Sequence, residues 1–73
     1  MKKNQHVVPR GDKWAVRGAG NSKVTITTNT QKEAFDVARS IAINQESEVL
    51  IHRANGKIRA KHSYGNDPFP PEG

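Results

Sequence analysis

Two dipeptides, each set between short segments of alternating apolar and polar residues, most constrain how this chain folds. They are Gly11-Asp12 and Asn55-Gly56. Both are favoured in two-residue β-hairpin loops, because glycine adopts the positive φ that such loops need. The chain has 73 residues, so two hairpins and the segment between them leave room for one small domain.

The first hairpin signal fixes a register. If Gly11-Asp12 is the centre of the turn, Pro9 faces Trp14 and Val7 faces Val16. The apolar residues then share one side of the ribbon, which supports this pairing. Because proline has no backbone N–H, Pro9 also predicts that the first strand lies at an edge of the sheet.

The second hairpin signal separates an apolar face from a basic one. With Asn55-Gly56 at the turn centre, Val49 pairs with His62, Ile51 with Ala60, and Arg53 with Ile58. On the other face Leu50 pairs with Lys61, His52 with Arg59, and Ala54 with Lys57. Side chains alternate along a strand, so this register predicts one largely apolar face and one strongly basic face.

A strand and a helix are predicted between the two hairpins. Residues 23–28 are rich in β-branched side chains and predict a third strand. Thr30 and Glu33 form a capping-box pattern, so a helix begins there and ends near Asn44.

The predicted fold class is therefore α+β, in the order β-β-β-α-β-β. We expect a mainly antiparallel sheet with one helix packed on one face. Residues 1–63 form the single domain, and residues 64–73 form a Pro-rich C-terminal tail. The helix should cover an apolar sheet face built from Trp14, Val16, Val24, Ile26, Val49, Ile51 and Ile58.

The opposite face is predicted to carry the positive charge. Twelve Lys and Arg against seven Asp and Glu give a net charge of +5, which favours polyanionic partners. Threonines 25 and 27 lie among the predicted cations and can donate to phosphate oxygens. A solvated face whose charges only prevent edge aggregation is the alternative. The residues expected to contact nucleic acid are Lys57, Arg59 and Lys61, assisted by Lys13, Arg17 and Lys23.

A protein-interaction adaptor is the second hypothesis. Prolines 68, 70 and 71 favour an extended tail that docks with little loss of entropy. Tyr64, Phe69 and Pro70 are its candidate contact residues, and the helix flank at Val37 and Ile43 is a candidate dimer surface. A homodimer is an open alternative for such a protein, because a domain with a thin core often gains stability by association.

Other functional classes find little support in the residues. The chain has no cysteine, which fits a cytoplasmic location. His52 and His62 fall on opposite predicted faces, so we expect neither a metal site nor a cofactor. So short a chain rarely forms the concave pocket of an enzyme, and we expect a non-enzymatic domain. No apolar run approaches the roughly 20 residues of a membrane helix.

Two family resemblances accompany these patterns. Residues 13–42, with the TQKEA stretch that begins at Thr30, resemble the AP2-like or arm-type DNA-binding modules of phage integrases. That resemblance implies a three-stranded sheet lying in the major groove, although this chain adds a second hairpin after the helix. HVVP, GDKWAV, TQKEA, NGKIR and SYGNDPFPP together resemble the uncharacterised bacterial family called domain of unknown function 2188. The second resemblance spans nearly the whole chain and implies no established activity.

Overall fold

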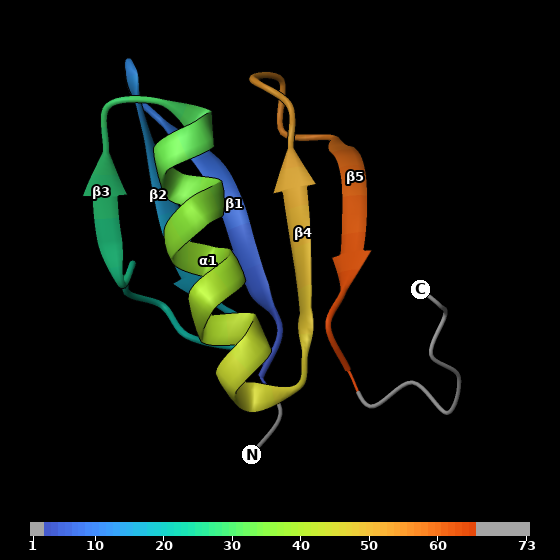
Figure 1. Cartoon of the computed structure of the whole chain (residues 1–73). Helices are drawn as coiled ribbons and strands as arrows, with labels where there is room; N and C mark the ends of the chain where they lie inside the picture. The colour runs from blue at the N-terminus through green and yellow to red at the C-terminus, as the bar shows by residue number, and fades with distance from the viewer. Residues whose placement is uncertain (1–2, 66–73) are drawn as a thin grey trace.

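The structure is a computed structural model that describes residues 3–65 (Figure 1). Its elements follow the predicted order β-β-β-α-β-β. They are β1 (Gln5–Arg10), β2 (Lys13–Gly18), β3 (Ile26–Thr28), α1 (Gln31–Gln45), β4 (Glu48–His52) and β5 (Ile58–Ser63). Phe69 and Pro70 of the predicted tail lie outside the described residues.

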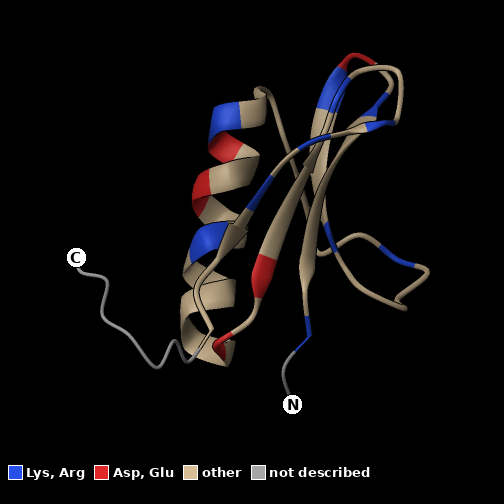
Figure 2. Cartoon of the chain, turned by 90° about the vertical axis from the view of Figure 1, so that its right-hand side faces the viewer, with Lys and Arg blue, Asp and Glu red and all other residues tan. Residues whose placement is uncertain are grey.

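The strands form one five-stranded sheet in the order β3-β2-β1-β4-β5. All neighbouring strands are antiparallel except β1 and β4, which run parallel. Helix α1 crosses one face of this sheet, and no other described element covers the opposite face (Figures 1 and 2). The predicted α+β class, with a mainly antiparallel sheet and one helix on one face, is confirmed.

Helix α1 begins and ends where its local signals place it. The Thr30 hydroxyl accepts from the Glu33 amide at 3.1 Å, and the Glu33 carboxylate accepts from the Thr30 amide at 3.2 Å. The capping box is therefore complete. Glu46 ends the helix in a left-handed conformation with φ of 54°, the usual geometry after a last helical turn.

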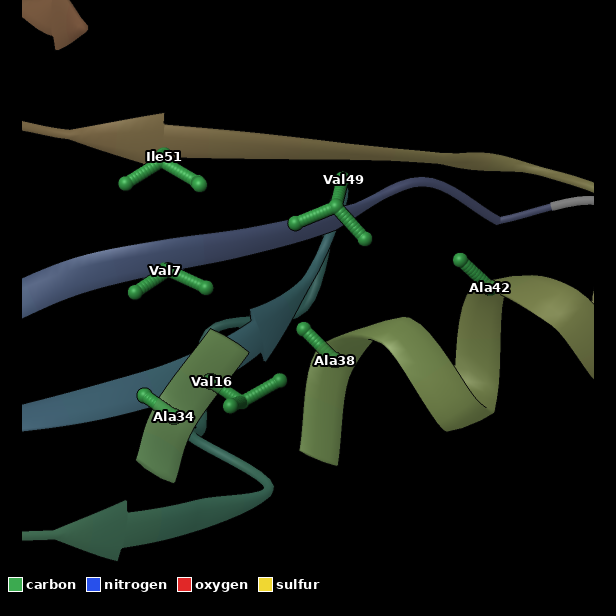
Figure 3. Close-up of a cluster of buried hydrophobic side chains, with 7 residues drawn as sticks. All are labelled: Val7, Val16, Ala34, Ala38, Ala42, Val49 and Ile51. Atoms are coloured by element: carbon green, nitrogen blue, oxygen red, sulfur yellow. The ribbon is translucent and has the colours of Figure 1, made fainter. Parts of the chain in front are cut away.

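Alanine lets the helix approach the sheet closely. Ala34, Ala38 and Ala42 recur every fourth residue and are fully buried, so one stripe of small side chains meets the strands. Figure 3 shows this stripe facing the branched side chains of the sheet. Those sheet residues are Val7, Val16, Val49 and Ile51.

Two residues predicted for the core lie at the surface instead. Ile26 is 42% exposed because it sits on the short edge strand β3, and Ile58 is 55% exposed. The cause at Ile58 is a change of register in the second hairpin. Trp14 is half-buried and packs against the core. The predicted apolar face is thus correct at its centre and wrong at its margins.

Strand β1 is central, so the predicted edge position was wrong. Its pairing with β4 ends at Val7, opposite Ile51. Pro9 lies beyond that point and pairs only with Trp14 of β2. A proline at this position removes no hydrogen bond from the β4 ladder, which is why a central strand tolerates it.

The first hairpin has the predicted register throughout, with Val7 opposite Val16 and Pro9 opposite Trp14. The third strand is shorter than predicted, because β3 starts only at Ile26. Lys23 therefore lies in the loop between β2 and β3 and not on a strand.

Candidate nucleic-acid interface

Both hairpin turns lie at the same end of the sheet. Because β1 and β4 are parallel neighbours, their C-terminal ends meet at one edge, and each strand there enters its turn. The start of α1 reaches the same end, where the Gln31 side-chain amide donates to the His52 carbonyl at 3.0 Å. Three segments distant in sequence therefore converge (Figure 1).

Exposed cations gather at this end of the molecule. Figure 2 shows the blue Lys and Arg segments of the two turns and of the first helical turn at its top. Acidic groups are fewer: Asp12 lies in the first turn, Glu33 is engaged in the capping box, and Asp36 pairs with Lys32 at 3.2 Å. We call the cationic set the basic end, and it comprises Arg10, Lys13, Lys32, Arg53, Lys57 and Arg59.

The turn between β4 and β5 differs from the predicted two-residue loop. The Gly56 amide donates to the Arg53 carbonyl at 2.8 Å, and the Arg53 amide donates to the Lys57 carbonyl at 2.6 Å. Gly56 has a φ of 92°. These contacts define a loop that ends on a left-handed glycine, which shifts the pairing of β5 by one residue.

A β-bulge at Arg59 then shifts the pairing back. His52 pairs with Ile58, whereas Ile51 pairs with Ala60, so Arg59 is an extra residue on β5. From there the predicted register holds, with Val49 opposite His62. The bulge exchanges the faces of Ile58 and Arg59. Because Ile58 is opposite His52, it lies on the open face.

Arg59 consequently lies on the helix side of the sheet. Its Nη1 donates to the Gln31 side-chain oxygen at 3.0 Å, and it lines a cleft together with Phe35 and Ile51. The predicted placement of Arg59 on the open face, opposite His52, was wrong. The reason is the bulge, which the alternation of residue types does not reveal.

The other predicted contact residues are dispersed. Lys57 is exposed in the second turn and Lys13 at the start of β2, where its Nζ donates to Asn29 at 2.7 Å. Lys61 is on the open face, 3.9 Å from the Glu48 carboxylate. Arg17 is half-buried and its Nη1 contacts the Asn21 carbonyl at 3.5 Å. Lys13 and Arg17 alternate with the core residues Trp14 and Val16, so they share the open face with Lys61. The predicted basic face is therefore present only in part, without Arg59 and Lys23.

A pair of histidines occupies part of the open face. The His6 Nδ1 lies 3.0 Å from the His52 Nε2, and the His52 Nδ1 lies 3.1 Å from the Gly56 carbonyl. Since a carbonyl only accepts, the His52 Nδ1 donates to Gly56. The His52 Nε2 then accepts from the His6 Nδ1. Burial, followed by His52 and Arg17, lowers the pKa of His6. The pair joins β1 to the second turn.

Sequence reasoning missed Arg10, Arg53 and Lys32 as members of one cluster. Arg10 and Arg53 flank the two turn dipeptides, which is the signal that was available. Their proximity depends on the parallel pairing of β1 with β4, which no local pattern indicates. Tyr64, a predicted partner contact, packs against the core with the Arg39 guanidinium 5.7 Å from its ring.

The described part of the chain holds neither a metal-binding cluster nor a membrane-spanning helix. Within residues 3–65 no group of three or more His, Cys, Asp or Glu side chains is arranged to hold a metal ion. None of the helices in that range is long and apolar enough to cross a membrane.

Comparison with known proteins identifies relatives without assigned roles. A family model described as "Uncharacterized protein conserved in bacteria (DUF2188)" matches residues 5–64. The "Uncharacterized protein YdaT" of Bacillus subtilis (strain 168) is 35% identical over 66 residues, which cover 90% of this chain and 44% of that protein. This chain thus spans less than half of that relative's length. No solved structure matches, and the likeness to integrase modules is not shown.

Proposed function

For this chain, which belongs to the DUF2188 family of uncharacterized bacterial proteins, we propose that the basic end binds nucleic acid and that the domain is non-enzymatic. The sheet-face interface predicted from sequence is replaced in this proposal by the two turns and the start of α1. Of the residues first predicted, Lys57 and Arg59 retain the role of principal contacts, and Lys13, first predicted as an assisting residue, joins them.

The observation that carries the proposal is the convergence of cations from three separate segments. Arg10 and Lys13 flank the first turn, Arg53 and Lys57 flank the second, and all four are exposed. Lys and Arg neutralise phosphates and release condensed counterions, which supplies most of the affinity for a nucleic-acid backbone. Each hairpin turn is also the end of a two-stranded ribbon, which the major groove of duplex DNA can admit.

The start of α1 adds to the positive potential. The first N–H groups of a helix and its dipole favour negative charge nearby. Here Gln31 joins the helix to β4, so the helix start is held beside the second turn. Because backbone contacts of this kind carry no sequence information, we expect weak sequence specificity.

The test is the salt dependence of duplex binding, measured by fluorescence anisotropy with labelled DNA and RNA. If about three phosphates are neutralised, the slope of log K against log salt on B-DNA is about −3. Lys57→Ala should reduce that slope by about one, since it removes one phosphate contact.

Lys23→Ala is the matched control, because Lys23 is also exposed in a loop but follows β2 at the other end of the sheet. Equal effects of the two substitutions would contradict the proposal. So would the absence of binding at low salt. Arg53→Glu combined with Lys57→Glu should weaken binding by about tenfold or more, since each substitution reverses a charge.

An adaptor function is the second candidate, supported by one observation on the helix flank. Ile43 is 45% exposed on α1, and an exposed aliphatic residue on a helix can pack against a second copy or a partner helix. Sedimentation of the wild type and of Ile43→Ser at the same concentration distinguishes a dimer through this flank from a monomer.

A further inference from the structure

A cleft of about 290 Å³ opens between the start of α1 and strand β5. Gln31, Lys32 and Phe35 contribute from the helix, and the sheet contributes Ile51, Arg59 and His62. A larger hollow of about 500 Å³ lies over residues 20–25, but it is formed by consecutive residues of one loop. The smaller cleft is the one built by separate elements of the fold.

The interior of the cleft combines two ring systems with an aliphatic side chain. The Phe35 and His62 rings lie with centroids 5.2 Å apart and planes tilted by 57°. Ile51 is 5% exposed and belongs to the hydrophobic core. Such a surface suits a flat ring, which gains by packing against aromatic groups.

Cationic groups stand at the margin of this apolar surface. Arg59 is brought there by the bulge and is held by its 3.0 Å hydrogen bond to Gln31. Gln31 is fixed in turn by its bond to the His52 carbonyl. Lys32 is exposed, and its Nζ lies 3.2 Å from the Asp36 carboxylate. The Arg59 guanidinium donates one N–H to Gln31 and has further donors for a phosphate.

We propose that this cleft binds one nucleotide, with its base against Phe35 and His62 and its phosphate at Arg59 and Lys32. The volume lies at the lower limit of ligand sites, roughly 300–1,000 Å³, which restricts the occupant to one ring system with its phosphate. The Gln31 side chain already bonds the His52 carbonyl and Arg59, so its part in this site is to orient the Arg59 guanidinium.

This inference rests on the proposed function, because the nucleotide would come from a nucleic acid held by the basic end. It would be an unpaired nucleotide at the end of a strand. A free nucleoside monophosphate has the same chemistry. The experiment therefore measures binding of both free monophosphates and strand ends.

The experiment follows backbone amide resonances of the protein during titration with AMP, UMP, adenosine and inorganic phosphate. We expect both monophosphates to perturb the amides around Arg59 and His62, and to bind more tightly than either adenosine or phosphate alone. Arg59→Gln should lower the affinity for both monophosphates by about fivefold or more, because it removes one charge-assisted contact. Lys61→Gln is the matched control, because Lys61 lies on the same strand but on the open face, outside the cleft, and it should leave monophosphate binding unchanged.

A second substitution separates the base from the phosphate. Phe35→Leu keeps an apolar side chain but removes the ring, so the advantage of AMP over inorganic phosphate should shrink while phosphate binding persists. Binding of AMP no tighter than phosphate, or equal effects of Arg59→Gln and Lys61→Gln, would overturn the inference.

Labelled duplexes with and without an unpaired overhang complete the test. Tighter binding of the overhang, lost in Arg59→Gln, supports the strand end as the source. Blunt duplex bound as tightly as the overhang, with no monophosphate binding, overturns the cleft but leaves the proposed function standing. Monophosphate binding in the cleft without duplex binding supports a free nucleotide and removes the proposed function instead.

Discussion

The two hairpins of this domain begin from similar turn signals and reach different structures. The first has a tight turn at Gly11-Asp12 and pairs regularly from Arg10–Lys13 to Gln5–Gly18. The second has a longer loop ending on Gly56 and a bulge at Arg59. The regular hairpin supplies Val7 and Val16 to the core, and the irregular one supplies Val49 to the core and the sheet side of the cleft.

The difference shows how a bulge changes what a strand presents. In a regular β5, Ile58 would face the helix and Arg59 the open side. The bulge puts Arg59 beside Gln31 and leaves Ile58 55% exposed. An apolar contact is thereby exchanged for a positioned guanidinium, which is the kind of local loss of stability expected at a binding site.

The largest expected effect is the loss of stability on truncating a buried aliphatic residue of the first hairpin, compared with an exposed one of the second. Val16→Ala should lower the free energy of unfolding by about 2–3 kcal/mol, since Val16 is fully buried and its truncation leaves a cavity. Ile58→Ala should cost less than about 1 kcal/mol, although it removes more atoms. Urea denaturation of both variants checks this. A greater loss for Ile58→Ala would show that β5 is regular.

The turn glycines provide the next comparison. Gly11 and Gly56 have φ of 64° and 92°, and a Cβ at either would meet no atom within 4 Å. Any penalty is therefore conformational and not steric. Since asparagine accepts the left-handed region near +57°, Gly11→Asn should cost under about 0.5 kcal/mol and Gly56→Asn about 1 kcal/mol. Thermal unfolding of the pair measures this, and equal losses would contradict the assigned turns.

The histidine pair that joins β1 to the second turn predicts a pH dependence. The pKa of His6 is lowered from its ordinary value of 6.5, first by burial and then by His52 and Arg17. The unfolded chain therefore binds a proton more readily than the folded one, so stability is full above pH 6.5 and declines as the pH falls through the folded pKa. His6→Gln should reduce the change in the free energy of unfolding between pH 7 and pH 5, as measured by urea denaturation. A wild-type curve already flat in that window would contradict this.

The smallest expected effect is at Lys61, which faces Glu48 across 3.9 Å. Exposed ion pairs contribute little, so Lys61→Ala should change the free energy of unfolding by less than about 0.5 kcal/mol. Because Lys61 lies outside the basic end, its loss should also weaken duplex binding less than Lys57→Ala does. Equal binding losses would restore the sheet face as the interface.

Local signals predicted most of the fold. The capping box located the start of α1, and the Gly11-Asp12 dipeptide fixed the whole register of the first hairpin. They failed where the structure depends on non-local pairing. The central place of β1 follows from its contact with β4, which alternation along one strand cannot reveal.

The site was less predictable than the fold. A one-residue slip reverses the faces of a strand, so the bulge was enough to misplace Arg59 and Ile58 while Ile51–Ala60 stayed correct. Residue types still indicated the chemistry, because Lys57, Lys13 and Arg59 do belong to the basic end. What they could not indicate was which segments the fold brings together.

The most direct test of the account is a map of backbone amide shifts on addition of a short blunt duplex at low salt. Binding through the two turns and the helix start predicts that the perturbed amides cluster at residues 10–13, 31–33 and 53–59, and that added salt reverses the changes. Perturbations centred on residues 20–25, or on the outer surface of α1, would contradict the account.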